Sequence, residues 1–385
     1  MFTRRFIAFS LLVSLYLASC GTDDHSDIEN PPAEVPPFDE GGNVWLRGDF
    51  HVHSSHSNDA AENHIDEIVD HAQNTLGMDF FVVTDHDNHL DGDMTESWED
   101  PAFTDHDMTL LYGAEYTTAF GHACVLGLEP WDHPALYALR DEQENGEAIV
   151  SLAHEMGLHF SINHPTGKDL WEFDFDIGYD SMEVWNAPWT FPNPAEKNLE
   201  LWDAQVRELE RRIPIRGGSD CHHYHDHPEA EINNIGNPTT WLYASENSPE
   251  AILEALASGR ASVSFAPHGE RVAIWADGDL DGAFETVMGD ALPEATGETI
   301  RLGVEIGNAE AGVERTIEVY SHASPLVPVA SLTTTRLRET IDLPAIDGRG
   351  YYRVQLRGEL QGVGVLLRGL GSRVLSISNP IYAGY

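Results

Sequence analysis

The chain has 385 residues, of which 41% are hydrophobic, so it is long enough for two folded units with substantial cores. It carries 21 Lys and Arg against 65 Asp and Glu, a formal net charge of −44. A surface this acidic would repel a phosphate backbone, so we expect no nucleic-acid partner.

The N-terminus has the pattern of an export signal. Arg4 and Arg5 precede an apolar run over residues 6–17, and small residues precede Cys20. This predicts a signal peptide over residues 1–19. The tetrad Leu17-Ala18-Ser19-Cys20 resembles a bacterial lipobox, which implies an exported protein held in a lipid bilayer by acylated Cys20. Gly21 after it implies transport to the outer membrane. A plain cleaved signal peptide is the alternative.

Residues 20–42 are rich in Asp, Glu, Pro and Gly and contain few apolar side chains. Such a segment cannot bury enough surface to fold, so we expect a tether. After the signal, the remaining cysteines are Cys124 and Cys221. Two cysteines are too few for a disulfide framework, although a single bridge stays open.

Strand-like runs alternate with amphipathic helical stretches between residues 43 and 268. We expect helices over 62–75, 142–156 and 194–212, each followed by a short apolar strand at 80–83, 160–162 or 214–216. This alternation predicts an α/β fold with a parallel sheet or barrel. The carboxyl ends of parallel strands form one rim, where side chains distant in sequence converge.

Beyond residue 268 the helical periodicity disappears. Alternating runs at 300–304 and 351–356 are separated by Gly and Asp turns, which predicts a small β-sandwich-like domain over residues 269–385. Residues 277–282, with Asp277, Asp279 and Asp281, match the opening of a calcium loop. Position twelve is Met288 rather than Glu, so a structural calcium ion and an acidic hairpin turn both stay open.

Histidines and carboxylates cluster behind the predicted strands, and the chain contains 20 His residues. The candidates are His51 and His53 with His56 and Asp59 after them, then His86, Glu115, His122, His164, and the pair Asp220 and His222. Imidazoles and carboxylates in these proportions are accepted by zinc, manganese and iron. The sequence therefore predicts a metal or catalytic site at the rim.

These motifs, in order, resemble the PHP superfamily, named for polymerase and histidinol phosphatase domains. They are His51-x-His53, Thr84-Asp85-His86, Glu115, Asn163-His164-Pro165 and Asp220-x-His222. Gly48-Asp49-Phe50-His51, Gly121-His122, Glu183-Val184-Trp185-Asn186 and Ser378-Asn379-Pro380-Ile381-Tyr382 resemble its CehA/McbA-type branch. The resemblance implies a distorted seven-stranded (β/α) barrel followed by the β-rich domain.

The resemblance also implies two or three divalent ions and their ligands. The first ion would be held by His51, His53, Glu115 and Asp220, the second by Glu115, His122 and His164, and the third by His86, His222 and Asp59. Asn58 stands at the usual position of the last carboxylate, so a two-metal site stays open. Glu115, Asp220 and His222 are the expected catalytic residues.

Two cations about 3.5–4 Å apart lower the pKa of a bridging water toward neutrality. The favoured function is therefore a phosphoesterase that attacks a small-molecule phosphate mono- or diester with a metal-bridging hydroxide. The same hydroxide could cleave a carboxylic ester, carbamate or amide. A third hypothesis is a non-catalytic surface lipoprotein that binds metal or glycans.

Several residues near the motifs could contact the substrate. Lys168 could neutralise a phosphate oxygen, Trp185 or Trp189 could stack on the leaving group, and His223 could protonate the departing alkoxide, as could His225 or His227. A surface lysine, packed tryptophans and solvated loop histidines explain the same residues equally well.

Overall fold

The computed structural model describes residues 35–38, 41–104, 108–166, 170–186, 196–224, 234–293, 297–359 and 372–385. Residues 35–385 belong to one compact unit. The expected signal peptide and Cys20 lie outside the described residues, as do Lys168, Trp189, His225 and His227. None of the helices in the described ranges has the length and apolar character needed to cross a membrane.

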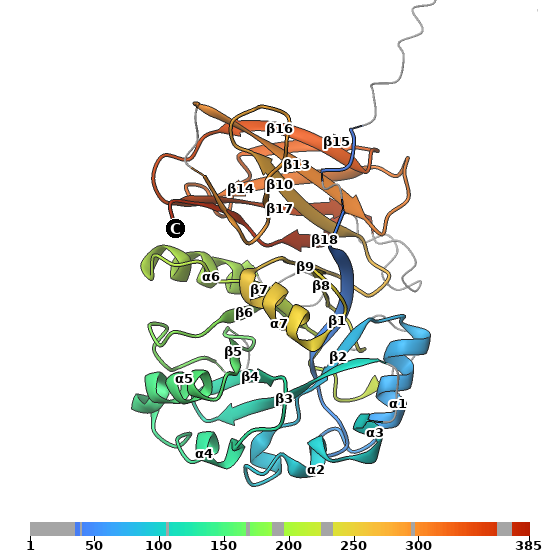
Figure 1. Ribbon diagram of the computed structural model, residues 1–385, viewed down its shortest axis with the longest axis vertical. Helices are drawn as coiled ribbons and strands as arrows, with labels where there is room; N and C mark the ends of the chain where they lie inside the picture. The colour runs from blue at the N-terminus through green and yellow to red at the C-terminus, as the bar shows by residue number, and fades with distance from the viewer. Residues whose placement is uncertain are drawn as a thin grey trace, which may run out of the picture. The chain divides into compact units, whose positions relative to one another are not determined.

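The first part of the chain alternates strands and helices (Figure 1). Its strands are β1 (Val44–Val52), β2 (Phe80–Val83), β3 (Thr109–Thr118), β4 (Gly121–Gly127), β5 (His159–Ile162), β6 (Ser181–Asn186), β7 (Ile215–Gly218), β8 (Thr239–Ala244) and β9 (Ala261–Ser264). Its α-helices are α1 (Ile65–Asp70), α2 (Thr95–Trp98), α3 (Pro101–Thr104), α4 (His133–Tyr137), α5 (Gly146–Glu155), α6 (Glu196–Glu208) and α7 (Pro249–Ser258). A π-helical turn, η1 (His71–Thr75), and 3-10 turns η2 (Asp87–His89) and η3 (Gln143–Asn145) complete it.

The three predicted helix–strand units are present, with shorter helices than expected. The helix expected over 62–75 is α1 continued by η1. It begins only at Ile65 because residues 60–63 form a turn in which Asn63 N donates to Ala60 O. Gly77 and Gly157 follow two of these helices with φ of 64° and 76°, a left-handed conformation that ends a helix and favours glycine. The described chain is thus mixed α/β with a large sheet.

The large sheet is mixed and not parallel throughout, which corrects the expected parallel sheet. Strands β1, β2 and β3 are parallel, as are β5, β6 and β7, but β4 is antiparallel to both β3 and β5. The physical reason is the short connection between Thr118 and Gly121, which permits a hairpin but no crossover helix. The start of β4 therefore lies beside the end of β3.

The chain after β7 returns to the end of β1. Asp220 N donates to His51 O (2.7 Å) and His53 N donates to Cys221 O (3.1 Å), and Val52 forms a parallel bridge with Cys221. These bonds join the two segments that carry the motifs His51-x-His53 and Asp220-x-His222. The strand ends of β1, β3 and β7 and the start of β4 therefore share one rim.

Residues beyond 268 form strands only, within the described ranges (Figure 1). The strands β10 (Arg271–Asp277), β11 (Thr286–Val287), β13 (Thr299–Gly307) and β16 (Arg338–Pro344) form a four-stranded sheet. The strands β12 (Ala291–Leu292), β14 (Arg315–Ser321), β15 (Ala330–Thr334), β17 (Gly350–Gly358), β18 (Arg373–Ser378) and β19 (Ile381–Ala383) belong to the large sheet. Side chains of both sheets, such as Ile274, Val304, Val319 and Val354, share one core.

Hydrogen bonds continue across the expected boundary between residues 268 and 269. Strand β18 pairs with β9, and the buried Asn379 side chain donates to Ile215 O and Ala261 O (both 2.8 Å) while accepting from Ile215 N (2.8 Å). Asn379 therefore ties the C-terminal segment to the base of β7. A domain boundary at this position stays a prediction.

Candidate metal centre

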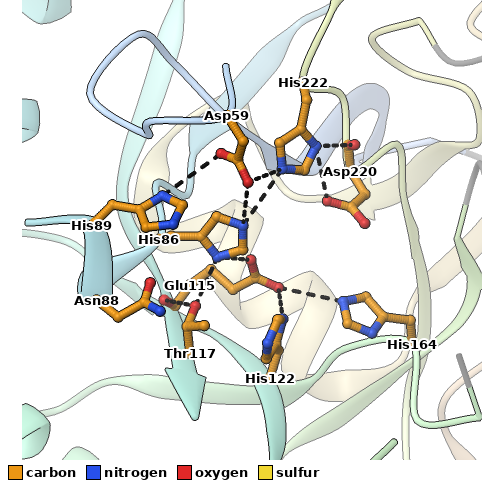
Figure 2. Close-up of a pocket in the computed structure, with 10 residues that line it drawn as sticks. All are labelled: Asp59, His86, Asn88, His89, Glu115, Thr117, His122, His164, Asp220 and His222. Atoms are coloured by element: carbon orange, nitrogen blue, oxygen red, sulfur yellow. Dashed lines mark hydrogen bonds and ion pairs between the residues drawn. The ribbon is translucent and has the colours of Figure 1, made fainter. Parts of the chain in front are cut away.

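A polar pocket of about 280 Å³ opens at this rim (Figure 2). It is lined by Asp59, His86, Asn88, His89, Glu115, Thr117, His122, His164, Asp220 and His222. His51 and His53 lie buried at its base, each within 3.5 Å of Glu115 and Asp220 oxygens. The structure thus brings every predicted metal ligand to one place.

Glu115, fully buried on β3, is the centre of the cluster. Its Oε1 lies 3.1 Å from His51 Nε2, 3.3 Å from His122 Nδ1 and 3.4 Å from His164 Nε2. Its Oε2 lies 2.8 Å from His86 Nδ1. Oε2 also lies 3.5 Å from His53 Nε2. Because Oε1 faces His122 and His164 while Oε2 faces His53, this carboxylate has the geometry of a bridge between two ligand sets.

The hydrogen-bond partners of His222 and His86 fix the ring protons on Nδ1. His222 Nδ1 lies 2.9 Å from Asp220 O, a carbonyl that can only accept. Thr117 donates its hydroxyl proton to Glu115 O (3.0 Å), so the hydroxyl oxygen accepts from His86 Nδ1 (2.8 Å). Both Nε2 atoms are therefore left with lone pairs, as metal-binding histidines require.

The Asp59 carboxylate lies close to the Nε2 atoms of both His86 and His222. Its Oδ2 lies 3.5 Å from His86 Nε2 and 3.6 Å from His222 Nε2. His56, an alternative candidate beside it, instead contacts Asp100 at 3.0 Å and does not line the pocket. The structure therefore favours Asp59 as the carboxylate of this ligand set.

A buried network orients His51. Its Nδ1 lies 3.0 Å from Glu183 Oε1, which also accepts from Arg216 Nη1 (2.8 Å). The other carboxylate oxygen accepts from the backbone N of His164 and from Asn186 Nδ2, both at 2.9 Å. Glu183 and Arg216 are fully buried, so their charges compensate each other. A carboxylate behind a histidine is the usual support of a metal ligand.

The residues fit a bound cation. His51 Nε2 is buried and has no hydrogen-bond partner in the described chain, although Glu115 Oε1 is only 3.1 Å away. A lone pair and a carboxylate this close repel unless a proton or a metal ion lies between them. Three-ligand groups whose donor atoms lie within 4.8 Å of one another are His53, His86 and His222; His51, His53 and Asp220; His51, Glu115 and His164; and His86, Glu115 and His122.

Without metal, protons replace the cations. Burial opposes a charge on His86, but the carboxylates of Glu115 and Asp59 raise its pKa to about 9. Burial also opposes a charge on Glu115, yet His51, His86 and His122 hold the pKa of that carboxyl well below its usual range. The site thus keeps the Glu115 carboxylate ionised and requires positive charge beside it.

Backbone strain coincides with two of the ligands. His164 has φ of 24° and Asp220 has φ of 53°, a left-handed conformation that costs a non-glycine residue about 1–3 kcal/mol. Such strain persists where the surrounding structure enforces it, commonly at functional sites. It turns both side chains into the pocket.

Asp85 organises the loop that presents Asp59. It is fully buried and accepts hydrogen bonds from Ser54 N (2.6 Å) and from the hydroxyls of Ser54 (2.7 Å), Ser57 (3.1 Å) and Ser97 (2.7 Å). These four hydrogen bonds use both oxygens of the Asp85 carboxylate. Asp85 therefore supports the site without entering the pocket.

Other predicted substrate contacts lie elsewhere. Trp185 is only 2% exposed, packs near Phe265 in the core and does not line the pocket, which corrects its assignment as a stacking residue. An aromatic side chain on the inner face of a buried strand packs in the core. His223 is exposed and also lies outside the pocket lining.

Cys124 and Cys221 form no disulfide; both thiols are buried.

Several functional candidates escaped prediction. Glu183 stood in the motif Glu183-Val184-Trp185-Asn186 without an assigned role, and Arg216 was hidden because a buried ion pair between two strands leaves no local pattern. Asn88 and His89 line the pocket because η2 continues directly from the predicted ligand His86. Their only sequence signal was proximity to that ligand.

The acidic segment 277–285, which begins with the expected calcium loop, has a compact geometry. Carboxylate oxygens of Asp277, Asp279 and Glu285 lie within 4.8 Å of one another. The buried Asp277 already accepts from Leu280 N (2.6 Å) and Gly282 N (2.9 Å), as an acidic turn does. Calcium binding at this loop stays a prediction.

No family model matches the sequence, and no curated protein is detectably similar to it. Among solved structures, the chain is similar to a two-domain protein from Bacteroides vulgatus containing a predicted PHP-like metal-dependent phosphoesterase (17% identity, TM-score 0.44, covering 91% of this chain and 99% of that one). It is also similar to endonuclease Q in complex with a duplex carrying an abasic lesion (13%, 0.39, 55% and 56%).

A third similarity is to an amidohydrolase from Chromobacterium violaceum with bound sulfate and no metal (16% identity, TM-score 0.32, covering 45% of this chain and 86% of that one). All three TM-scores are below 0.5, so these similarities do not assign the chain to a family. The fold and site define a mixed α/β protein with a candidate metal centre of histidines and carboxylates. Its function has to be inferred from these side chains.

Proposed function

We propose that the protein is a metal-dependent hydrolase of the PHP superfamily and its CehA/McbA-type branch, and that it acts as a phosphoesterase. The observation that carries this proposal is the position of Glu115, whose two carboxylate oxygens face separate groups of ligands: Oε1 faces His122 and His164, and Oε2 faces His53. A single ion would need only one such group. Strands β1–β7 would form the distorted barrel of that superfamily.

The contacts around Glu115 support sites for at least two ions. His51, His53 and Asp220 with Glu115 would hold one. His122 and His164, at 3.3 and 3.4 Å from Glu115 Oε1, would hold another with Glu115. Asp59, His86 and His222 would hold a third. Divalent ions in such a site lower the pKa of water and polarise the oxygens of an ester.

The chain's own residues prepare the site for that chemistry. Glu183 and Asp220 O accept the Nδ1 protons of His51 and His222, which keeps the Nε2 lone pairs directed inward. The ionised carboxylates of Glu115 and Asp220 supply the negative charge that divalent ions require. The buried base around His51 and His53 excludes water from the inner side of the cluster.

The pocket wall favours a small polar group on the substrate. Its described lining contains neither Lys nor Arg and no apolar residue, so the charge of an anionic ester would be met by cations. A volume of about 280 Å³ is just below the range of pockets that enclose a drug-sized ligand, so it accommodates a phosphoryl group together with part of a small substrate. Several ions in one pocket suit the several oxygens of a phosphate ester.

Cleavage of a carboxylic ester, carbamate or amide is the second candidate, because a carbonyl can use the same ligand arrangement. The two are separated by comparing para-nitrophenyl phosphate, bis-para-nitrophenyl phosphate and para-nitrophenyl acetate with the full chain reloaded with manganese, zinc or iron. We expect chelator-sensitive turnover of a phosphate ester. Turnover of the acetate alone would contradict the phosphoesterase proposal and would favour a carboxylic ester hydrolase.

A non-catalytic role is the third candidate and has a distinct outcome. A surface lipoprotein that only binds metal or glycans would show no turnover of any of these esters, and any affinity for glycans would survive Glu115→Gln. The orientation of lone pairs into an open pocket favours catalysis over storage. We expect Glu115→Gln to remove turnover.

We also infer that the protein is exported and anchored in the cell envelope, facing the periplasm or the surface, through acylated Cys20. This rests on the apolar run at 6–17 and the small residues before the cysteine. Fatty-acid labelling of the full chain should depend on Cys20 and disappear in Cys20→Ser. Labelling that survives this change would contradict the anchor.

A further inference from the structure

His89 lies at the edge of the pocket without belonging to any ligand group. It ends the turn η2, three residues after the predicted ligand His86, and its side chain is 24% exposed. Its ring stands edge-on to that of His86 with centroids 4.8 Å apart. Figure 2 shows it beside Asp59 and Asn88. His89 is therefore held close to the site while still open to a bound substrate.

The partners of His89 place its ring proton on Nε2. The backbone N of Asn58 donates to His89 Nδ1 at 3.3 Å, and an amide can only donate. Asp59 Oδ1 lies 3.7 Å from the same nitrogen, beyond hydrogen-bond distance, so the amide decides the tautomer. This arrangement is opposite to that of His86 and His222, whose Nδ1 atoms carry the proton. His89 is thus arranged as a donor and not as a ligand.

The other lining residues leave few donors for a substrate. Thr117 lines the pocket, but its hydroxyl proton is given to Glu115 O. Lys and Arg are missing from the lining as far as the structure describes it. Asn88 is exposed, whereas His89 is fixed by the amide of Asn58. Outside the proposed ligand groups, His89 Nε2 is therefore a neutral donor held by the backbone, with no hydrogen bond to any described residue.

We propose that His89 is a specificity-determining residue that donates a hydrogen bond from Nε2 to an oxygen of the substrate's phosphoryl group, beside the ligands Asp59, His86 and His222. This role rests on the proposed phosphoesterase function. A neutral donor held by the backbone gives orientation without adding charge to a site that already gathers cations. It would bind the product phosphate through the same oxygen.

The test compares His89→Ala, His89→Gln and His89→Asn in the metal-loaded full chain. The amide nitrogen of Gln can reach the place of Nε2, whereas that of Asn reaches only the place of Nδ1. The measurements are KM and kcat for the phosphate ester, the inhibition constant of inorganic phosphate, and metal content. His154→Ala is the matched control, because His154 is exposed on α5 and pairs with Asp180 outside the pocket.

Loss of one hydrogen bond to an oxygen of an anionic phosphoryl group corresponds to about a 10- to 100-fold change in binding. We expect Ala and Asn to raise KM and the phosphate inhibition constant by this factor with unchanged metal content, and Gln to restore most of the loss. Unchanged constants in an active His89→Ala protein, or Gln no better than Ala, would overturn the role of His89 alone. A wild-type protein that neither hydrolyses phosphate esters nor binds phosphate would overturn the proposed function with it.

Discussion

The Nε2 atoms of His86 and His222 face each other at 3.5 Å, although neither carries the ring proton in the neutral state that its partners define. Two lone pairs at this distance repel each other. Asp59 Oδ2 lies at 3.5 and 3.6 Å from the same atoms, which adds negative charge. The arrangement is stable only with a cation among the three, and in the metal-free protein an added proton on His86 supplies it.

His222→Ala should remove one ion and leave the others. The variant loses a nitrogen of the Asp59, His86 and His222 set but keeps Glu115 and His164 intact. We expect elemental analysis to show fewer ions per chain than in the wild type, and turnover to fall by about 100-fold or more, beyond the usual effect of an outer-shell change. An unchanged ion count would contradict the assignment of His222.

Glu115→Gln should damage both sides of the site at once. The substitution preserves shape but removes the charge that faces two groups of histidines. We expect loss of bound metal and a fall in turnover of more than about 100-fold. Glu155→Gln, at the exposed end of α5, is the matched control and should leave both quantities at the wild-type level. Retained metal and turnover in Glu115→Gln would exclude a bridging role.

Glu183 and Arg216 should act on stability and metal affinity in separable ways. Glu183→Gln weakens the acceptor behind His51, so we expect metal affinity to fall by about 10- to 100-fold. Arg216→Met removes the guanidinium that compensates the buried Glu183 charge, which should lower the free energy of unfolding by about 3–5 kcal/mol. Urea unfolding measures this loss, and Glu183→Gln combined with Arg216→Met should recover part of it. A double variant less stable than Arg216→Met would argue against charge compensation.

The stability of the metal-free protein should fall as pH rises from 6.5 to about 9. The pKa of His86 is raised from 6.5 to about 9 in the folded protein, so its proton stabilises the fold fully below pH 6.5 and is lost at higher pH. Urea unfolding across this range measures the effect. His86→Gln should flatten this part of the profile. A profile that rises with pH in the wild type and is unaltered in the variant would contradict it.

The affinity for metal should rise with pH over the range in which the stability of the metal-free protein falls. The ion has to displace the proton of His86, so we expect binding to tighten between pH 6.5 and about 9 and to release protons into a weak buffer. Titration with zinc or manganese at several pH values measures both. Affinity independent of pH across this range would show that His86 is not a ligand.

The rim and most of its ligands could be predicted from sequence because polar residues followed apolar strands. His86 follows β2 and His164 follows β5. Both lie at the rim because the carboxyl ends of parallel strands meet at the same edge of a sheet. His122 reaches the same rim for a different reason. It begins β4, and the hairpin after Thr118 turns that strand back beside Glu115. His122 was predicted from the motif Gly121-His122 and not from the periodicity of the strands.

The roles of the supporting residues could not be predicted because these residues act through contacts between distant segments. Glu183 meets Arg216, 33 positions away, inside the sheet. The orientation of His89 depends on the backbone amide of Asn58, which has no side-chain signature. Trp185 was misassigned because an aromatic residue beside a motif is equally compatible with a pocket wall and a core, and only burial distinguishes them.

The most direct test follows metal content and hydrolysis together in one wild-type sample. The full chain is stripped with a chelator, reloaded with manganese, zinc or iron, and assayed on a phosphate ester at each stage while ions per chain are counted. We predict more than one divalent ion per chain, with turnover that disappears on chelation and returns on reloading. Binding of a single ion, or turnover that persists after the ions are removed, would contradict a hydrolase built around Glu115.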